Sequence, residues 1–390
     1  MTFHRPQLAA EMAEQLLRPR GLMKTVRSGL FLGGQRRIGK TTFLRSDLIP
    51  ALEAQGAIVV YVDLWSNTAA KPSDLLLAAV RNTLADLQRA DSKAVGVLKR
   101  LKGLDLGAAG FKFGFSLADL GKDEGNTLAG AFSELVRLAK TDVVVIIDEV
   151  QHAMGSDDGE HMLLALKAAR DAINLIPDPH GYFLFLGTGS HRARVRELTI
   201  QGKQAFNGAT SQDFPVLQID FVEWLLKEAE LGARTPSVGA TFECFERLGR
   251  RPEELMKALV ALVQAPNFTD ADQDIRAITE GVRQSAAALD LARLDELGPV
   301  ALAVFGYVCT QGGQGVKRLF SSATLDHYGA EVGRAVGVEE IQKIANYLVH
   351  ANILVRDGHG IYGVSDPFVA EAYNNRANVL RTLDGPRATK

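Results

Sequence analysis

The sequence has only two cysteines, Cys244 and Cys309, among its 390 residues. They lie far apart in segments that we expect to be helical, so buried free thiols in a reducing compartment are favoured over a disulfide. No apolar run approaches the roughly 18 residues that a membrane-spanning helix needs. The opening segment also lacks the apolar stretch of a signal peptide, because Glu11, Glu14 and Arg18 interrupt it. We therefore expect a soluble cytoplasmic protein without a membrane partner.

An excess of charge of either sign is also missing. The 44 Lys and Arg residues and the 46 Asp and Glu residues give a formal net charge of -2. Composition thus gives no global argument for binding to nucleic acid or to a membrane surface, and any basic surface must be local. Hydrophobic residues make up 46% of the chain, which supplies a sizeable core, and the length fits about two or three domains.

One glycine-rich stretch organises the chain. A short apolar run at residues 29–33 enters a turn that opens into an expected helix, Thr41 to Leu52. The turn matches the phosphate-binding pattern G-x-x-x-x-G-K-[ST]. Glycines let backbone N–H groups converge on a phosphate, and the helix N-terminus adds partial positive charge. Lys40 would reach the β- and γ-phosphates, and the Thr41 hydroxyl would ligate Mg²⁺. The predicted nucleotide-binding residues are Gly34, Gln35, Arg36, Arg37, Ile38, Gly39, Lys40, Thr41 and Thr42.

A second segment ends in two acids. Residues 143–147 are all apolar and lead into Asp148 and Glu149. Such a run is typical of a buried parallel strand, whose carboxyl end delivers side chains to a ligand crevice. Asp148 would hold Mg²⁺ through water, and Glu149 would activate the attacking water as a general base.

Further strands are predicted at Ala57–Asp63, Tyr182–Gly187 and Pro215–Ile219. Thr188 and Ser190 follow the second of these, where a polar side chain would sense the γ-phosphate; a simple strand-ending turn is the alternative. Residues 100–125 contain a period-two alternation, Phe111 to Ser116, which predicts an inserted β-hairpin. A surface hairpin is favoured there over a partner-binding insertion.

Arginines offer candidates for stabilising transition-state charge. Arg192, Arg194 and Arg196 lie on one expected helical segment and would act in a neighbouring subunit's site, or form a solvated basic face. Arg250, in Gly249-Arg250-Arg251-Pro252, would reach the γ-phosphate from a closing lid, or belong to a charged turn.

The second half of the chain is predominantly helical. Helices are predicted from Val222 to about Leu291, followed by three more between Val300 and His350 and an Asp-Gly hairpin at 353–364. Three helices followed by a hairpin predict a winged helix. Its third helix carries Glu339, Glu340 and Lys343, so the basic footprint expected for DNA is thin.

Several of these residues together resemble the archaeal-type P-loop ATPases of the AAA+/STAND assemblage. The loop from Gly34 to Thr41 is similar to that family's G-x-R-R-x-G-K-[ST], and residues 362–368 are similar to its Y-x-x-x-D-P segment after the wing. Phe3 and Arg5 loosely resemble the family's opening F-x-G-R, with His4 in place of the glycine. The lid motif G-G-x-P is changed, since Arg250 replaces the second glycine.

The resemblance implies an α/β fold of the ASCE type, with strand order 5-1-4-3-2, a helical lid and a C-terminal winged helix. We expect a P-loop nucleotide-binding domain at 1–220, a lid at 221–295 and a winged-helix domain at 296–390. The resemblance further implies ATP and Mg²⁺ as cofactors and slow hydrolysis used as a switch, with a protein partner or a homo-oligomer. The alternatives are a DNA-associated ATPase and a nucleotide-binding scaffold without turnover, and the acid pair argues against the scaffold.

Overall fold

The computed structural model describes residues 2–102, 110–117, 120–121, 127–190, 192–200, 204–267, 269–351, 353–358 and 360–383. The chain divides into two compact units, Met1–Val216 and Leu217–Lys390. Within the described ranges, no helix is both long enough and apolar enough to cross a membrane.

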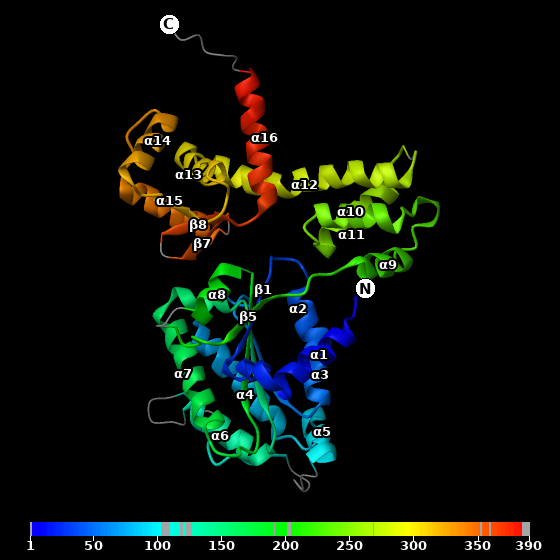
Figure 1. Cartoon of the computed structure of the whole chain (residues 1–390), viewed down its shortest axis with the longest axis vertical. Helices are drawn as coiled ribbons and strands as arrows, with labels where there is room; N and C mark the ends of the chain where they lie inside the picture. The colour runs from blue at the N-terminus through cyan, green and yellow to red at the C-terminus, as the bar shows by residue number, and fades with distance from the viewer. Residues whose placement is uncertain are drawn as a thin grey trace. The chain divides into compact units, whose positions relative to one another are not determined.

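A five-stranded parallel sheet forms the centre of the first unit (Figure 1). Its order is β2-β3-β4-β1-β5, which confirms the strand order that the resemblance implied. The strands are β1 Leu30–Gly33, β2 Ile58–Asp63, β3 Val143–Asp148, β4 Phe183–Gly189 and β5 Thr210–Asp213. Three of them, β1, β3 and β4, are buried throughout, as expected of parallel strands covered on both faces.

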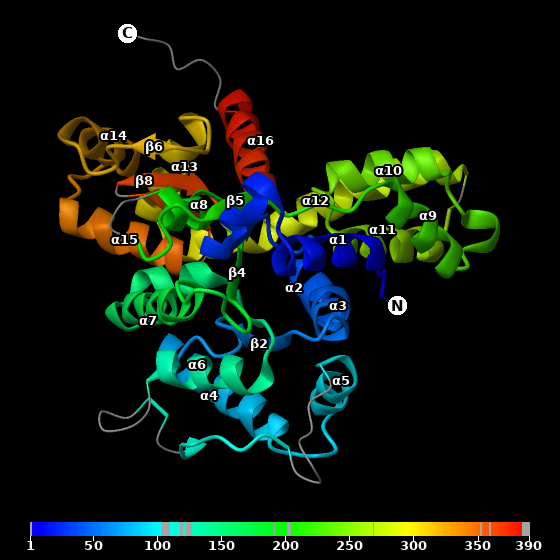
Figure 2. The ribbon, with the colours of Figure 1, turned by 60° about the horizontal axis from the view of Figure 1, so that its bottom comes forward.

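Helices cover both faces of this sheet (Figure 2). One face packs against α1 Pro6–Leu17, the turn η1 Gly21–Ser28, and a continuous helical run made of α2 Lys40–Phe43, η2 Leu44–Leu48 and α3 Ile49–Ala54. The other face packs mainly against α4 Pro72–Leu87, α6 Leu128–Ala139, α7 Asp157–Asn174 and α8 Arg192–Ile200. The short elements α5 Lys93–Lys102 and η4 Val150–Gly155 complete the unit.

Two predicted β elements of this unit are wrong. The last strand is Thr210–Asp213, and residues 215–218 form no strand. The observed strand escaped prediction because it is a half-exposed edge strand that pairs only with β1 and is built of polar residues. Pro215 has no N–H to donate to a ladder.

The predicted hairpin is also absent from residues 110–117, which are irregular. Phe111 is buried in the main core, and Phe113 and Phe115 pack partly against it. The alternation therefore reflects a row of aromatic anchors and not a pair of strands. The rest of the expected insertion lies partly outside the described residues, at 103–109, 118–119 and 122–126.

The second unit contains a helical group followed by a winged helix. The helical group comprises α9 Ile219–Glu228, the turn η5 Gly232–Arg234, α10 Val238–Arg247, α11 Pro252–Gln264 and α12 Ala271–Glu296. The winged helix comprises α13 Pro299–Thr310, β6 Val316–Lys317, α14 Ser322–Val332, α15 Val338–His350, β7 Leu354–Gly358 and β8 Ile361–Val364, and α16 Pro367–Leu383 follows it. Its sheet is antiparallel with the order β6-β8-β7.

The helical group and the winged helix of the second unit are connected through the long helix α12 and through an ion pair. Figure 1 shows α12 as one long helix that α16 crosses. Arg251, which is only 5% exposed, donates to Asp366 at 2.7 Å, and its guanidinium lies 4.7 Å from the centre of the Phe368 ring. Asp366 also accepts the backbone N–H of Phe368 in the first turn of α16. The arginine before Pro252 and the Asp-Pro after the wing thus form one junction.

Candidate active site

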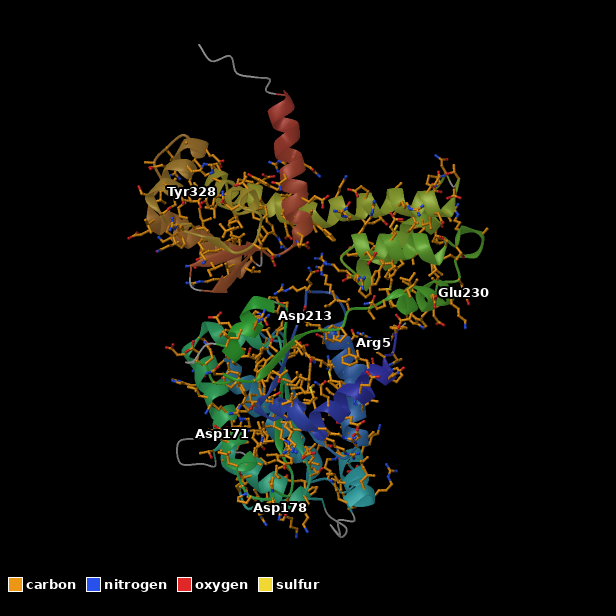
Figure 3. All side chains as sticks on the ribbon, viewed as in Figure 1. Arg5, Asp171, Asp178, Asp213, Glu230 and Tyr328 are labelled. Carbon is orange, nitrogen blue, oxygen red and sulfur yellow. The ribbon has the colours of Figure 1, made fainter. Side chains whose placement is uncertain are left out.

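The carboxyl edge of the parallel sheet collects the polar ends of its strands. Leu32 of β1 pairs with Thr188 of β4, and Asp63 of β2 pairs with Asp148 of β3. This register brings the loop after β1 beside the acids that follow β3. Figure 3 labels Asp213, at the end of β5, near the same edge as Arg5, whereas Asp178, which precedes β4, lies at the opposite end of the unit.

The loop after β1 has the backbone that a phosphate cradle needs. Gly39 adopts φ 87° and caps α2, so a side chain there would be strained. A Cβ on Gly34 would lie 2.8 Å from Ile38 Cδ1 and 3.1 Å from Phe214 Cβ, so a side chain there would require these neighbours to shift. Lys40 is 5% exposed and donates to the carbonyl oxygens of Gly34 and Gln35, each at 2.7 Å. Its ammonium group therefore lies inside the loop.

Thr41 and Asp148 are 107 positions apart in the sequence, but their side chains are hydrogen-bonded. The Thr41 hydroxyl donates to Asp148 Oδ2 at 2.5 Å. Asp148 is fully buried, and it also accepts hydrogen bonds from the hydroxyls of Thr188 and Tyr61 and from the backbone N–H of Glu149. Every oxygen of this carboxylate therefore has a donor, as a buried charge requires.

Glu149 lies beside it with a different set of partners. Its backbone is left-handed, with φ 57°, which directs the side chain away from the path of the strand. Oε2 accepts hydrogen bonds from Gln151 Nε2, from the Ser190 hydroxyl at 2.8 Å and from the Ser190 N–H at 3.3 Å. Burial alone would raise the pKa of Glu149, but Lys40, these hydrogen bonds and Arg36 together hold it below its ordinary value. The side chain is thus ionised at neutral pH.

Arg36 links the phosphate-binding loop to the ends of β2 and β4. Its Nε donates to Ser190 Oγ at 3.4 Å, and its guanidinium lies 4.6 Å from the centre of the Trp65 ring. Trp65 in turn contacts the His152 ring, with centroids 4.6 Å apart. Burial lowers the pKa of Arg36, while the charge of Glu149 opposes that shift.

The structure separates the two residues considered as sensors. Thr188 is completely buried and its hydroxyl is bonded to Asp148. Ser190 contacts Glu149, Gln151 and Arg36 instead. Sequence reasoning gave Tyr61 and Gln151 no role. A tyrosine inside an apolar strand and a glutamine two residues after Glu149 are the signals that could have identified them.

The N-terminal leader is tied to the helix that follows the loop. His4 Nδ1 lies 2.7 Å from Asp47 Oδ1, and the Arg5 N–H donates to Asp47 Oδ2 at 3.1 Å. The Arg5 side chain donates to the Pro215 carbonyl at 2.6 Å.

The candidate arginines are placed as follows. Arg250 belongs to the second unit, where it has φ 55° and donates to Gln218 Oε1 at 2.7 Å and to Glu246 at 2.6 Å. Arg196 is exposed on α8, and the side chains of Arg192 and Arg194 lie outside the described part of the chain.

The donors at this site suit a magnesium nucleotide. Amide-rich loop backbone and the Lys40 ammonium are donors for phosphate oxygens, and a hydroxyl beside a carboxylate offers the hard oxygen ligands that Mg²⁺ prefers. Within the described ranges, there is no cluster of three or more His, Cys, Asp or Glu side chains that could hold a metal ion. A site with few protein oxygens is what Mg²⁺ uses when phosphates and water complete its shell.

The chain has the parallel α/β sheet and the winged helix that the resemblance to AAA+-type P-loop ATPases implied. No protein-family model matches the chain, and neither does any curated protein. Among solved structures, it is similar to a Walker-type ATPase of Pyrococcus abyssi, with 16% identity, a TM-score of 0.57 and coverage of 95% of this chain and 96% of that one. It is also similar to the ORC2 protein of Aeropyrum pernix in its ADP form, with 12% identity, a TM-score of 0.50 and coverage of 97% and 94%. These likenesses confirm the fold that the resemblance implied.

Proposed function

We propose that this protein binds ATP with Mg²⁺ and hydrolyses it slowly, as a molecular switch. The observation that carries the proposal is the 2.5 Å contact between the Thr41 hydroxyl and Asp148. It joins the end of the phosphate-binding loop to the end of β3, which is where a magnesium triphosphate needs oxygen ligands from both. The Aeropyrum protein with the same fold is an ADP form, which supports a nucleotide at this edge.

The roles follow from the contacts. The N–H groups of residues 34–42 and the Lys40 ammonium would bind the phosphates, and Thr41 and Asp148 would hold the metal. Mg²⁺ would neutralise charge that develops on the phosphate oxygens. Glu149, which is ionised and lies within the field of Lys40, would take a proton from water as the water oxygen bonds to the γ-phosphorus and the bond to ADP breaks. Thr188 would act through Asp148 and not on the nucleotide.

We further propose that nucleotide state is transmitted to the second unit and to a protein partner or a second copy of the chain. The regions proposed are the nucleotide-binding domain at 1–220, the lid at 221–295 and the winged helix at 296–390. Arg250 is the lid candidate for the γ-phosphate, because its partners Gln218 and Glu246 are exposed, whereas Arg251 is buried and bonded to Asp366. Burial raises the pKa of the Cys244 thiol and raises that of Cys309 to about 12, which supports stable thiols in a reducing cytoplasm.

The test measures nucleotide binding and phosphate release for the wild type, Lys40→Ala and Glu149→Gln. Lys40→Ala should abolish binding, whereas Glu149→Gln should bind normally and lose roughly 10²-fold or more in kcat. Lys93→Ala, at an exposed position of α5, is the matched control and should change neither. ATP binding by Lys40→Ala as tight as that of the wild type would overturn the proposal.

A further inference from the structure

Gln151 is a buried polar residue that the proposed chemistry does not use. It lies in η4, two positions after Glu149, and is only 4% exposed. Its amide nitrogen donates back to Glu149 Oε2 and also to Ser190 Oγ at 3.0 Å. These two bonds satisfy the amide nitrogen of an almost completely buried side chain.

The bonds to Glu149 are one-sided. Gln151 Nε2, the Ser190 hydroxyl and the Ser190 N–H all donate to the same oxygen, Oε2. Among the residues that the structure describes, none donates to Oε1 of Glu149. The carboxylate is therefore held by one oxygen, and the other oxygen is left to accept a proton.

The surroundings keep the carboxamide in this orientation. A Cβ on Gly189 would collide with Gln151 Oε1 and lie 2.5 Å from Val195 Cγ2, so glycine at the end of β4 makes room for the glutamine. Oε1 is buried and has no donor within the described ranges. Turning the amide over would point a carbonyl oxygen at the carboxylate, so the orientation with nitrogen toward Glu149 is the favourable one.

The Glu149 carboxylate lies near the loop that follows β1. The positive charges of Lys40 and Arg36, both in the phosphate-binding loop, act on Glu149. Arg36 also reaches Ser190, which is itself bonded to Glu149. The carboxylate that Gln151 contacts is therefore close enough to the loop to be stabilised by its charges.

We infer that Gln151 is a positioning residue for hydrolysis: it fixes Oε2 of Glu149 so that Oε1 is the oxygen that receives the proton. The inference rests on the proposed ATP hydrolysis. Misplacing a reacting group by about 1 Å can cost on the order of 10²-fold in rate, so Gln151→Ala should lower kcat by roughly 10- to 100-fold. Because the hydrogen bonds of Gln151 within the described ranges go to Glu149 and Ser190 and not to the loop residues Lys40 and Thr41, KM and the affinity for a non-hydrolysable ATP analogue should stay within about twofold.

The activity test compares Gln151→Ala, Gln151→Glu and a control, Gln88→Ala, which lies at an exposed position after α4. Gln151→Glu has nearly the same shape but sets an acceptor against the carboxylate, so it should be at least as slow as Gln151→Ala. In a Glu149→Ala background, Gln151→Ala should cause no further loss, because residues that act as a unit are not additive. An unchanged or raised kcat in Gln151→Ala, or a fully additive loss in the double variant, would refute the inference.

A second readout does not need activity. Thermal unfolding midpoints of Gln151→Ala, Glu149→Ala and the double variant form a cycle. If Gln151 acts on Glu149, its removal shifts the midpoint by a different amount when Glu149 is already absent. If the wild type releases no phosphate, the proposed function fails, and the thermal unfolding cycle alone tests whether Gln151 acts on Glu149. Equal midpoint shifts from Gln151→Ala with and without Glu149 would overturn the inference, and unequal shifts would support the contact.

Discussion

Replacing Thr188 by valine removes one hydroxyl and leaves the shape of the side chain almost unchanged. Thr188 is fully buried and donates to Asp148, which is itself fully buried. A hydrogen bond to a charged acceptor contributes about 1.5–3 kcal/mol. For a unit of this size, each kcal/mol corresponds to roughly 2–4 °C in the melting temperature. Thr188→Val should therefore melt about 3–12 °C below the wild type.

The same change should weaken the metal site. If Asp148 holds Mg²⁺, Thr188 is an outer partner of a metal ligand, and loss of such a partner costs about 10- to 100-fold in metal affinity. The assay is the Mg²⁺ dependence of nucleotide binding and phosphate release. Thr141→Val is the matched control, since Thr141 is buried and donates to the Gly56 carbonyl at 2.6 Å, a neutral acceptor. The control should lose stability while keeping the Mg²⁺ dependence. An unchanged Mg²⁺ dependence in Thr188→Val would refute the assignment of Asp148.

Three further outcomes are expected. Burial alone would raise the pKa of Asp171, but hydrogen bonds from Lys167 and Arg170 place it below its ordinary value. The contribution of Asp171 to stability is therefore present above pH ~4 and is lost as the pH falls through the folded pKa. Asp171→Asn should reduce the acid sensitivity of urea unfolding. Arg251→Ala should destabilise the second unit by roughly 1.5–3 kcal/mol in urea unfolding, because the hydrogen bond of a buried guanidinium to the part-exposed Asp366 carboxylate is lost, whereas Arg247→Ala, in an exposed pair, should cost under ~1 kcal/mol. Because Glu339 and Glu340 occupy the first turn of α15, gel shifts at low salt should show at most weak duplex binding, and tight salt-dependent binding would favour the DNA-associated alternative.

The contiguous parts of the site were predictable from sequence. Lys40 and Thr41 share one loop with their glycines, and Asp148 and Glu149 end one apolar strand, so each pattern is complete within a short stretch. Gln151 and Tyr61 acquire roles only through the pairing of β2, β3 and β4. That register depends on tertiary pairing, which no local pattern encodes.

The different surroundings of Arg250 and Arg251 also could not be predicted from the sequence. They are adjacent and chemically identical, and the sequence gives no reason to prefer either. In the fold, Arg251 is buried against Asp366 and Phe368, while Arg250 bonds to the exposed residues Glu246 and Gln218 of the helical group. Likewise, the polar edge strand β5 was missed because its residues are half exposed and carry no apolar signal.

The two adjacent acids differ most in the kind of donor that holds each of them. The side-chain donors to Asp148 are three hydroxyls, from Thr41, Thr188 and Tyr61. A hydroxyl can both donate and accept, so the Thr41 oxygen can turn a lone pair to a cation while Asp148 keeps its other donors. Glu149 is held in part by amide N–H groups, which only donate. A carboxylate whose hydrogen-bond donors can turn to accept suits the binding of a metal ion that exchanges with each nucleotide. A carboxylate whose donors are fixed suits a general base that must keep its position.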